Sequence, residues 1–379
     1  MRKQNLAQSL AVESQIRLPG SAGRLLQQIR DVLAVAPLFK SAGLVKRVER
    51  PKVIDLTVSG IATHSCIKNA LGGYIYASGA VRIDMCIEQN QVGTGSNDSV
   101  SELDDIDFEA QRKRLDLVEI RQAYQLVEKQ LKQGNPSQLI LLDIPLFLDR
   151  AMAPLDRNVK HVEEYQRTKN VIAQFWSSYR EQLFPWNPQG PVLASIVSER
   201  FSAIVNIAKQ DLRTEEGRKH LLTTDELVQQ NLDKLADLES RLAGIGDKRF
   251  IHGILGSFTR TMAFRMTEST TRMEPAEAVD AGVIGFHYRG GHTSQIQMVQ
   301  LAGEAQDWDT KKLDAVAWKL MALDIQGQSK LKPLPQLLAM QQLKMLDQFA
   351  AYYRQGLSDA IKNNDVEDTW LSGLDEEQK

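Results

Sequence analysis

Three acidic residues stand at places where carboxylates can bind divalent metal ions. Asp55 lies in the β-branched run 52–58, Asp143 ends the apolar run 138–143, and Glu119 lies between them in a segment with helical spacing. Hydrolysis of a phosphodiester bond by two Mg²⁺ or Mn²⁺ ions requires several carboxylates within a few ångströms, because these ions prefer hard oxygen ligands. Burying a charge in an apolar strand is costly unless it is paired or binds a metal. The three residues therefore predict a metal site for phosphodiester hydrolysis.

Each of these acids also has a purely structural interpretation. Asp55 and Asp143 could cap a loop or pair with a buried arginine, and Glu119 alone is typical of a solvated helix residue. Their joint placement favours the catalytic interpretation. A separation of more than about 8 Å between the carboxyl groups of Asp55 and Asp143 would exclude a shared two-metal cluster, because metal–oxygen bonds are about 2.1 Å long.

Weaker candidates for substrate binding lie near the Gly290-Gly291 pair. His287, Arg289 and His292 could contact phosphate groups, but the same sequence is typical of a plain polar hairpin loop. Basic clusters at 46–52 and 112–114 could position a DNA backbone or could simply be solvated faces.

The predicted elements bring the three acids together. Short apolar runs predict an antiparallel meander of strands at 52–58, 72–77 and 80–87, with a tight turn at Ser78-Gly79. The polar stretch 91–105 predicts a loop. Hydrophobic periodicity then predicts a helix at 107–132, a strand at 138–143, a helix at 159–183 and a strand at 191–198. This order is that of an RNase H-like fold, so we expect an α/β protein with a mixed five-stranded sheet flanked by helices.

Helical additions are predicted on both sides of this core. Residues 9–42 have apolar side chains at helical spacing, broken by Pro19-Gly20, and a charged helical insertion is predicted at about 211–245. Strands resume at 283–301, and the chain closes with helices at 309–323 and 333–361 and an acidic tail that we expect to be disordered. The predicted units are a helical segment, 1–50, a core domain, 51–350, and a helix end with the tail, 351–379.

Composition restricts the classes of protein that the chain can belong to. The 379 residues are 42% hydrophobic and 25% charged, which is ordinary for a globular protein. With 46 Lys and Arg against 48 Asp and Glu, the net charge of −2 provides no global positive field, so any nucleic-acid contact must be local. No apolar run approaches the roughly 20 residues of a membrane span, and the N-terminus lacks the pattern of a secretory signal. We therefore expect a cytoplasmic protein, with Cys66 and Cys86 as free thiols.

Several short motifs, in this order and spacing, resemble the NurA nuclease family. Val53-Ile54-Asp55, the helical run from Arg114 to Glu119, and Leu141-Leu142-Asp143 are similar to the family's successive metal-site blocks. The run 331–340, with Pro333 and Pro335, resembles its closing Pro-x-Pro helix block. The resemblance spans about residues 50–350.

The resemblance implies an RNase H-like nuclease that uses Mn²⁺ or Mg²⁺ and forms a homodimer. It further implies action on DNA, in end processing and repair, together with the hexameric DNA-translocating ATPase HerA. Transferred by position, Asp55, Glu119 and Asp143 would be the metal ligands and catalytic residues.

Some positions depart from the family pattern. The family has Asp-Gly-Ser at both strand sites, where this chain has Leu56-Thr57 and Ile144-Pro145. Its C-terminal histidine falls on Met340, and its basic residue after the fifth strand falls near Arg200. Two hypotheses stay open. Either the chain is an active nuclease in which His287 or His292 replaces the lost histidine, or it is a catalytically degenerate scaffold that binds a partner ATPase or DNA.

Overall fold

The computed structural model describes most of the chain between residues 6 and 362. The described ranges are 6–70, 73–134, 136–148, 152–197, 229–236, 245–266, 282–292, 294–304, 306–327 and 332–362. Arg200, most of the predicted insertion at 211–245 and the acidic tail lie outside these ranges.

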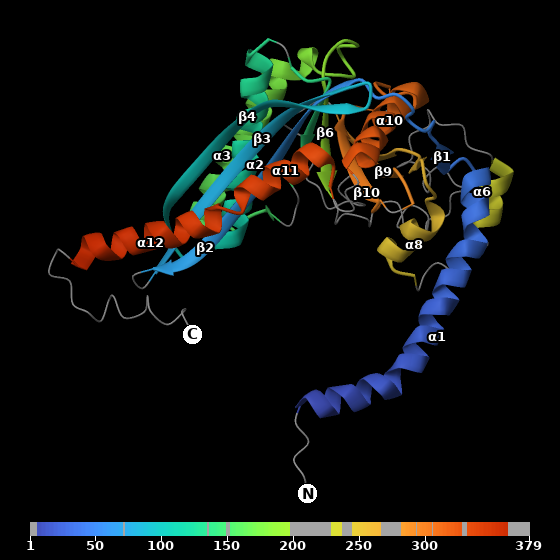
Figure 1. Ribbon diagram of the computed structural model, residues 1–379, viewed down its shortest axis with the longest axis horizontal. Coiled ribbons are helices and arrows are strands. Elements are labelled where there is room, and N and C mark those ends of the chain that lie inside the picture. Colours follow the sequence, from blue (N-terminus) through green and yellow to red (C-terminus); the bar gives the residue numbers. More distant parts are fainter. Residues whose placement is uncertain are drawn as a thin grey trace, which may run out of the picture.

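A single mixed sheet organises the molecule (Figure 1). Its strands are β1 (Val45–Arg47), β2 (Leu56–Ala70), β3 (Gly73–Glu88), β4 (Gln91–Ile106), β5 (Leu139–Leu142), β6 (Val192–Val197), β7 (Thr259–Thr261), β8 (Phe264–Arg265), β9 (Val283–Arg289) and β10 (Gln297–Ala302). They run in the order β1-β7-β9-β10-β6-β5-β2-β3-β4, and β8 pairs with β9.

The RNase H-like core predicted from sequence occupies half of this sheet. β2, β3 and β4 form the antiparallel meander, and β5 and β6 continue from β2 in parallel. The predicted strand order is therefore confirmed. The expected five strands are extended to ten, because β10, β9, β7 and β1 add antiparallel pairs beyond β6, while β8 adds to β9.

The predicted strand boundaries in the meander are wrong at three places, the first being the strand predicted at 52–58, which begins only at Leu56 and continues to Ala70. β3 runs straight through Ser78-Gly79, and the predicted loop at 91–105 is the strand β4. The actual turn lies at Gln89-Asn90, where φ is 46° and 68°, the backbone that a tight hairpin turn requires. β4 has the polar composition of a loop because it lies at the sheet edge, where exposed polar side chains are favoured.

Helices cover both faces of the sheet. α2 (Gln111–Lys132) and α3 (Val159–Tyr179) share a core with Ile140 and Leu142 of β5, whereas α10 (Thr310–Gly327) packs with Leu139 and Leu141 on the other face. α11 (Leu334–Leu343) and α12 (Leu346–Lys362) lie along β2 and β3. The shorter helices are η2 (Arg180–Gln182), α6 (Gln229–Ala236) and α8 (Asp247–Ile254). Strands covered on both faces explain the unbroken apolar runs in the sequence.

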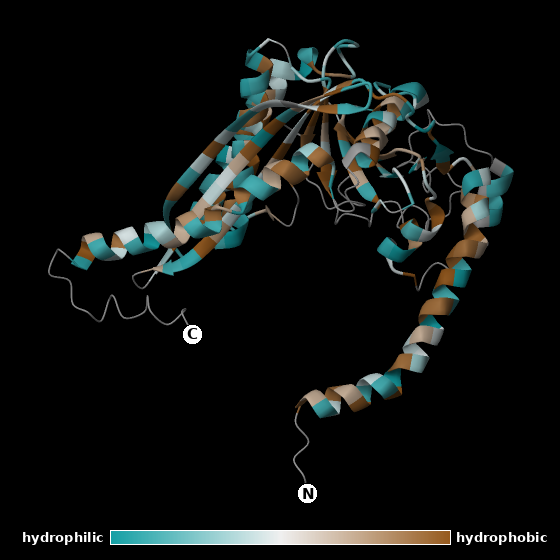
Figure 2. Ribbon diagram, viewed as in Figure 1, coloured by the Kyte–Doolittle hydropathy of each residue, from teal (hydrophilic) through white to brown (hydrophobic). Residues whose placement is uncertain are grey.

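The first helix extends away from the body. α1 (Leu6–Ser41) continues through Pro19, so the predicted break is absent, and only its C-terminal part is buried, at Val32, Val35, Ala36 and Phe39. Its remaining length projects from the molecule with apolar and polar side chains interspersed (Figures 1 and 2). Within the described ranges, no helix is both long and apolar enough to cross a membrane.

Candidate functional site

Two of the predicted acids meet at the end of β5, beside Thr63 of β2. Both carboxylate oxygens of Asp143 lie 3.1 Å from the Thr63 backbone nitrogen, which donates to them. The Thr63 hydroxyl oxygen lies 3.2 Å from Asp143 Oδ1 and 3.2 Å from Glu119 Oε2. The predicted convergence of Glu119 and Asp143 is thus present in the structure.

Glu119 is held by groups that compensate its charge. It is buried on α2, where the Ser65 hydroxyl donates to Oε1 and Arg112 Nη2 lies 3.6 Å from the same oxygen. Arg112 also pairs with Asp116, at 3.0 Å. Burial raises the pKa of Glu119, while the Ser65 hydrogen bond and Arg112 act against this rise. The carboxylate is therefore already engaged by the chain itself.

Asp143 is neutralised by a lysine from a distant part of the chain. Lys332, just before α11, places its Nζ 3.3 Å from Asp143 Oδ2. The Asp143 side chain is 6% exposed and that of Lys332 is 20% exposed. Burial raises the pKa of Asp143, against the attraction of Lys332 and the hydrogen bonds from Thr63. A buried carboxylate in this position needs a cation, and the lysine ammonium supplies one.

Asp55 does not join this site, which corrects the expectation from sequence. It is exposed, precedes the first residue of β2, and accepts a hydrogen bond of 2.7 Å from the Gln89 nitrogen at the hairpin turn. The parallel register pairs Ile61 with Leu142, so Thr63 rather than Asp55 lies beside Asp143. Eight residues of extended strand separate Asp55 from Thr63, about 26 Å at roughly 3.3 Å per residue. The two aspartates therefore cannot share a metal cluster.

The fold implies a divalent metal centre, but the described residues do not fit one. The β2 side chain that contacts Asp143 is the hydroxyl of Thr63, which is not a carboxylate, and Lys332 already neutralises Asp143. In the described ranges, no group of three or more His, Cys, Asp or Glu side chains is placed to hold a metal ion. The carboxylates of Glu119 and Asp143 are instead paired with cations of the chain itself, Arg112 and Lys332.

The other sequence candidates lie away from Glu119 and Asp143. His287 is completely buried on β9, with its ring 5.7 Å from that of Phe264, because both faces of this strand are covered. Arg289 lines a cavity beside α8 and donates to the backbone oxygen of His292, and Arg200 is outside the described residues. Met340 is 38% exposed on α11, which packs against Ala62 and so on the face of β2 opposite to Thr63. The position proposed for the family histidine does not reach the acids.

Comparison with known proteins supports the fold assignment. No family model and no curated protein matches the sequence. The crystal structure of the NurA nuclease from Sulfolobus solfataricus matches 97% of this chain and 99% of its own, with 14% sequence identity and a TM-score of 0.54. This chain has a NurA-like fold. A second NurA crystal structure covers the same 97% of the chain at 12% identity, with a TM-score of 0.45. The resemblance inferred from the motifs is thereby confirmed for the fold.

Sequence reasoning missed two members of the site, Thr63 and Lys332. The alternation along β2 could have indicated that Thr63 and Ser65 share a face, but its register with β5 is set by tertiary pairing. Lys332 precedes the Pro-x-Pro block, and nothing in that block indicates an ion pair with Asp143, which is 189 residues away in sequence.

Proposed function

We propose that the chain is a NurA-type DNA-binding subunit that does not use the two-metal mechanism of phosphodiester hydrolysis. The observation that carries the proposal is the ion pair between Lys332 and the buried Asp143. In an RNase H-like site this aspartate must be available to metal ions, and here its charge is satisfied by an ammonium group. The NurA-like fold supports DNA as the partner.

Electrostatics make the lysine an effective competitor for a metal ion. A cation entering the site would meet the positive charges of Lys332 and Arg112 as well as the carboxylates of Glu119 and Asp143. Removing one partner of a buried ion pair costs about 3–5 kcal/mol, because the other charge is left uncompensated. A metal ion that binds Asp143 must first displace the Lys332 ammonium, and breaking this ion pair incurs part of that cost. A metal site without such a lysine has no ion pair to break.

We infer the remaining partners from the family resemblance. They are a HerA-like hexameric ATPase and a second copy of this chain, with a role in DNA end processing. Co-purification with such an ATPase, and the mass of the isolated protein measured by light scattering, test these two partners separately.

A second candidate function is a Mn²⁺- or Mg²⁺-dependent DNA nuclease. The convergence of Glu119 and Asp143 on one hydroxyl favours it, because Mg²⁺ is often bound by only one or two protein carboxylates together with substrate phosphates. Lys332 would then have to leave Asp143.

Cleavage of end-labelled single- and double-stranded DNA in Mn²⁺ separates the two functions. We compare the wild type with Asp143→Asn and with Asp55→Asn, a matched variant of an exposed acid far from the site. The scaffold function predicts DNA binding without cleavage that depends on Asp143. Cleavage that is lost in Asp143→Asn and kept in Asp55→Asn would establish the nuclease and overturn our proposal.

A further inference from the structure

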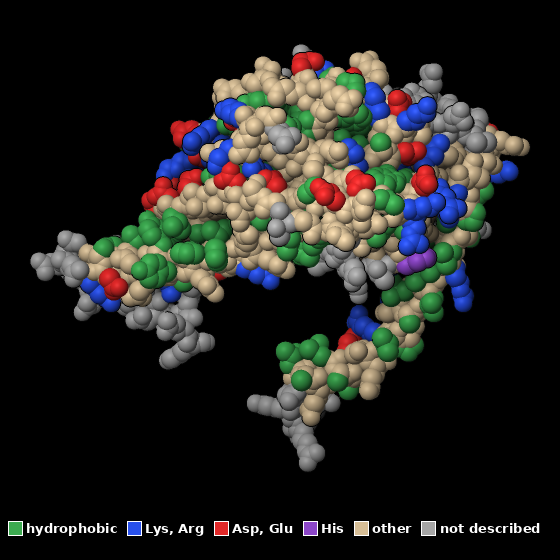
Figure 3. All heavy atoms as spheres, turned by 45° about the horizontal axis from the view of Figure 1, so that its top comes forward, with side chains coloured by type: hydrophobic (Ala, Val, Ile, Leu, Met, Phe, Trp, Pro, Cys, Tyr) green, Lys and Arg blue, Asp and Glu red, His purple; other side chains and the backbone are tan. Residues whose placement is uncertain are grey.

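A cavity between α1 and α8 collects basic side chains. It has a volume of about 720 Å³, and its apolar floor includes Val32, Ile254 and Leu255. The charged and titratable side chains that line it are Lys40, Lys248, Arg249, His252 and Arg289. Figure 3 shows Lys and Arg side chains together with a His where α1 meets the body of the molecule. Among the residues that the structure describes, no carboxylate lines this cavity.

The basic groups of this cavity lack carboxylate partners among the described residues. Arg249 donates to the side chain of Gln28, a neutral acceptor. Arg289 donates to the backbone oxygens of Gly291, Leu255 and His292, at 3.2, 3.3 and 2.7 Å. These bonds hold the Arg289 guanidinium in place without neutralising it. Like charges placed together repel each other, and an anion bound among them would remove this cost.

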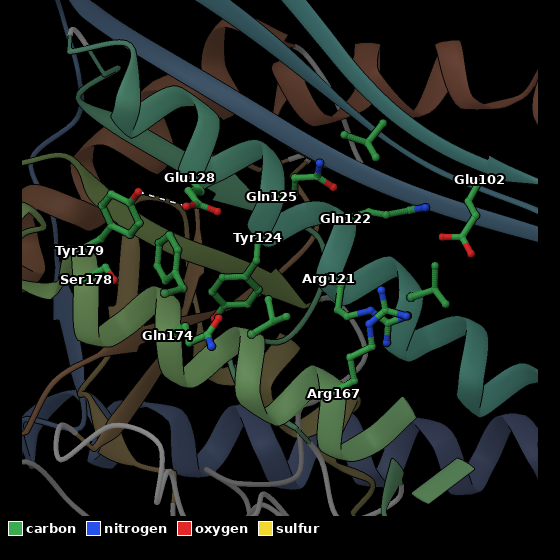
Figure 4. Close-up of a pocket in the computed structure, with 14 residues that line it drawn as sticks. Glu102, Arg121, Gln122, Tyr124, Gln125, Glu128, Arg167, Gln174, Ser178 and Tyr179 are labelled. Atoms are coloured by element: carbon green, nitrogen blue, oxygen red, sulfur yellow. Dashed lines mark hydrogen bonds between the residues drawn. The ribbon is translucent and has the colours of Figure 1, made fainter. Parts of the chain in front are cut away.

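Other polar regions of the molecule show the opposite arrangement. A cavity of about 590 Å³ between α2, α3 and β4 also contains arginines, Arg121 and Arg167 (Figure 4). There Arg121 pairs with Glu164 at 2.6 Å, and Tyr179 donates to Glu128 at 3.2 Å. The cavity between α2, α3 and β4 thus neutralises its own charges, whereas among the described residues the cations of the α1–α8 cavity have no carboxylate partner.

The walls of the α1–α8 cavity are fixed by close packing. Gly253 allows α8 to approach α1, since a Cβ at this position would lie 2.2 Å from Val32 Cγ1. His252 is beside Arg289, and burial together with that cation lowers the pKa of His252. An imidazole ring can stack on a nucleic-acid base.

We propose that this cavity binds a phosphate-bearing nucleotide, with the phosphate on the lysines and arginines and the base on the apolar floor. Its volume lies within the range of about 300–1,000 Å³ that is typical of small-molecule sites. Two sources have this chemistry, a free mononucleotide and a nucleotide within a single DNA strand. The strand source rests on the proposed DNA-binding function, whereas the mononucleotide source does not.

Binding measurements on the full-length chain distinguish these sources. We use fluorescence anisotropy of a labelled twelve-residue oligothymidylate and, separately, calorimetric titration with AMP. The cavity variant is Lys40→Ala/Lys248→Ala, which removes two exposed cations whose side chains make no hydrogen bond or ion pair with the described residues, so the fold should stay intact. The matched control is Lys344→Ala/Lys362→Ala, next to α11 and at the end of α12 (Figure 1).

We expect the cavity variant to bind the probe that occupies the cavity about tenfold more weakly than the wild type. For the DNA strand, the slope of log K against log salt should also become shallower by about 1.4, since each phosphate contact on a single strand contributes about 0.7. The control should match the wild type. His252→Ala provides a second test, because it removes the stacking group and leaves the lysines, so it should weaken binding at unchanged salt slope.

Each result decides between the two proposals. AMP binding that depends on the cavity lysines, without DNA binding, would support the cavity and overturn the DNA-binding function. DNA binding that is equal in the cavity variant, His252→Ala and the control, without AMP binding, would overturn the cavity and leave the DNA-binding function. Binding of neither probe by the wild type would overturn both.

Discussion

Two charged regions of this molecule differ in how their charges are balanced. At the end of β5, Glu119 and Asp143 are accompanied by Arg112 and Lys332, so carboxylates and cations are matched within the chain. Between α1 and α8, the basic side chains contact neutral groups only among the described residues. The carboxylates of the Glu119–Asp143 region are therefore neutralised by the chain itself, whereas the cations of the α1–α8 cavity have no carboxylate partner among the described residues.

The difference shows how a site can keep its shape while its chemistry changes. The backbone that brings β2, β5 and α2 together is set by burial of apolar strands and does not need the metal. In this chain a hydroxyl, that of Thr63, and an ammonium group, that of Lys332, contact Asp143. Retained geometry is thus weak evidence for retained catalysis, because function depends on the side chains of the site.

Asp324 is a third buried acid, and it differs from Glu119 and Asp143 in having no neutralising cation among the described residues. We expect its substitution to change the free energy of unfolding more than the other variants do. It lies on α10 at 8% exposure, and burial without a neutralising cation raises its pKa to about 8. The folded state therefore keeps a proton that the unfolded state releases above its ordinary pKa of about 4. The free energy of unfolding should fall as pH rises from about 4 to about 8, by roughly 1.4 kcal/mol per pH unit from this group.

Asp324→Asn should remove this contribution and stabilise the protein by several kcal/mol at pH 8, with little effect at pH 4. Urea unfolding at both pH values measures the change. Identical pH dependence in the variant and the wild type would show that the carboxyl group of Asp324 is not the source.

Lys332→Ala breaks the ion pair on which the comparison depends. We expect a loss of about 3–5 kcal/mol in the free energy of unfolding at pH 7, because the buried Asp143 carboxylate is left without its cation. Lys129→Ala is the matched control, since Lys129 and Asp98 form a more exposed pair at 2.7 Å that should contribute about 0–1 kcal/mol. Equal losses of unfolding free energy in the two variants would mean that the Lys332–Asp143 ion pair stabilises the fold no more than an exposed pair does.

Ser65→Ala removes the hydrogen bond that the Ser65 hydroxyl donates to Glu119, together with the one it accepts from Arg112 Nη1 at 3.0 Å. A hydrogen bond to a charged group contributes about 1.5–3 kcal/mol, so a loss in this range is expected at neutral pH. At a pH low enough to protonate Glu119 the loss should shrink, and comparison of urea midpoints at the two pH values measures this. A loss that does not depend on pH would assign the effect to packing.

Asp55→Asn is expected to have the smallest effect. The residue is exposed, and an asparagine oxygen can still accept the hydrogen bond from the Gln89 nitrogen. The change in unfolding free energy should stay within about 0.5 kcal/mol, and DNA binding should be unaltered. A loss of DNA binding or cleavage in Asp55→Asn would show that Asp55 has a functional role.

Hydrophobic patterns predicted the framework of this fold well. The periodicity of residues 107–132 predicted α2, and the apolar runs at 138–143 and 191–198 predicted β5 and β6. These predictions succeed because segments buried against or within a sheet have a recognisable local pattern of apolar residues. The polar edge strand β4 was missed since its composition is that of a loop. The ten-stranded extent of the sheet depends on antiparallel pairs between short, distant strands, which no local pattern specifies.

The candidate site was predictable only in part. Glu119 and Asp143 were identified because a carboxylate at the end of an apolar strand, or leaning from a helix toward the sheet, is chemically conspicuous. Asp55 was misplaced because a shift in strand register cannot be read from a β-branched run. The role of Lys332 could not be predicted from the sequence, because ion pairs between distant segments depend on tertiary structure.

The most direct test is Mn²⁺ binding at the Asp143 site, measured by electron paramagnetic resonance of the free ion. The variants are Asp143→Asn and the double variant Thr63→Asp/Lys332→Ala, which introduces a carboxylate on β2 and removes the competing ammonium. We predict no Asp143-dependent binding by the wild type at submillimolar Mn²⁺, and a new site in the double variant. Binding by the wild type that disappears in Asp143→Asn would contradict the central claim that Lys332 replaces the metal.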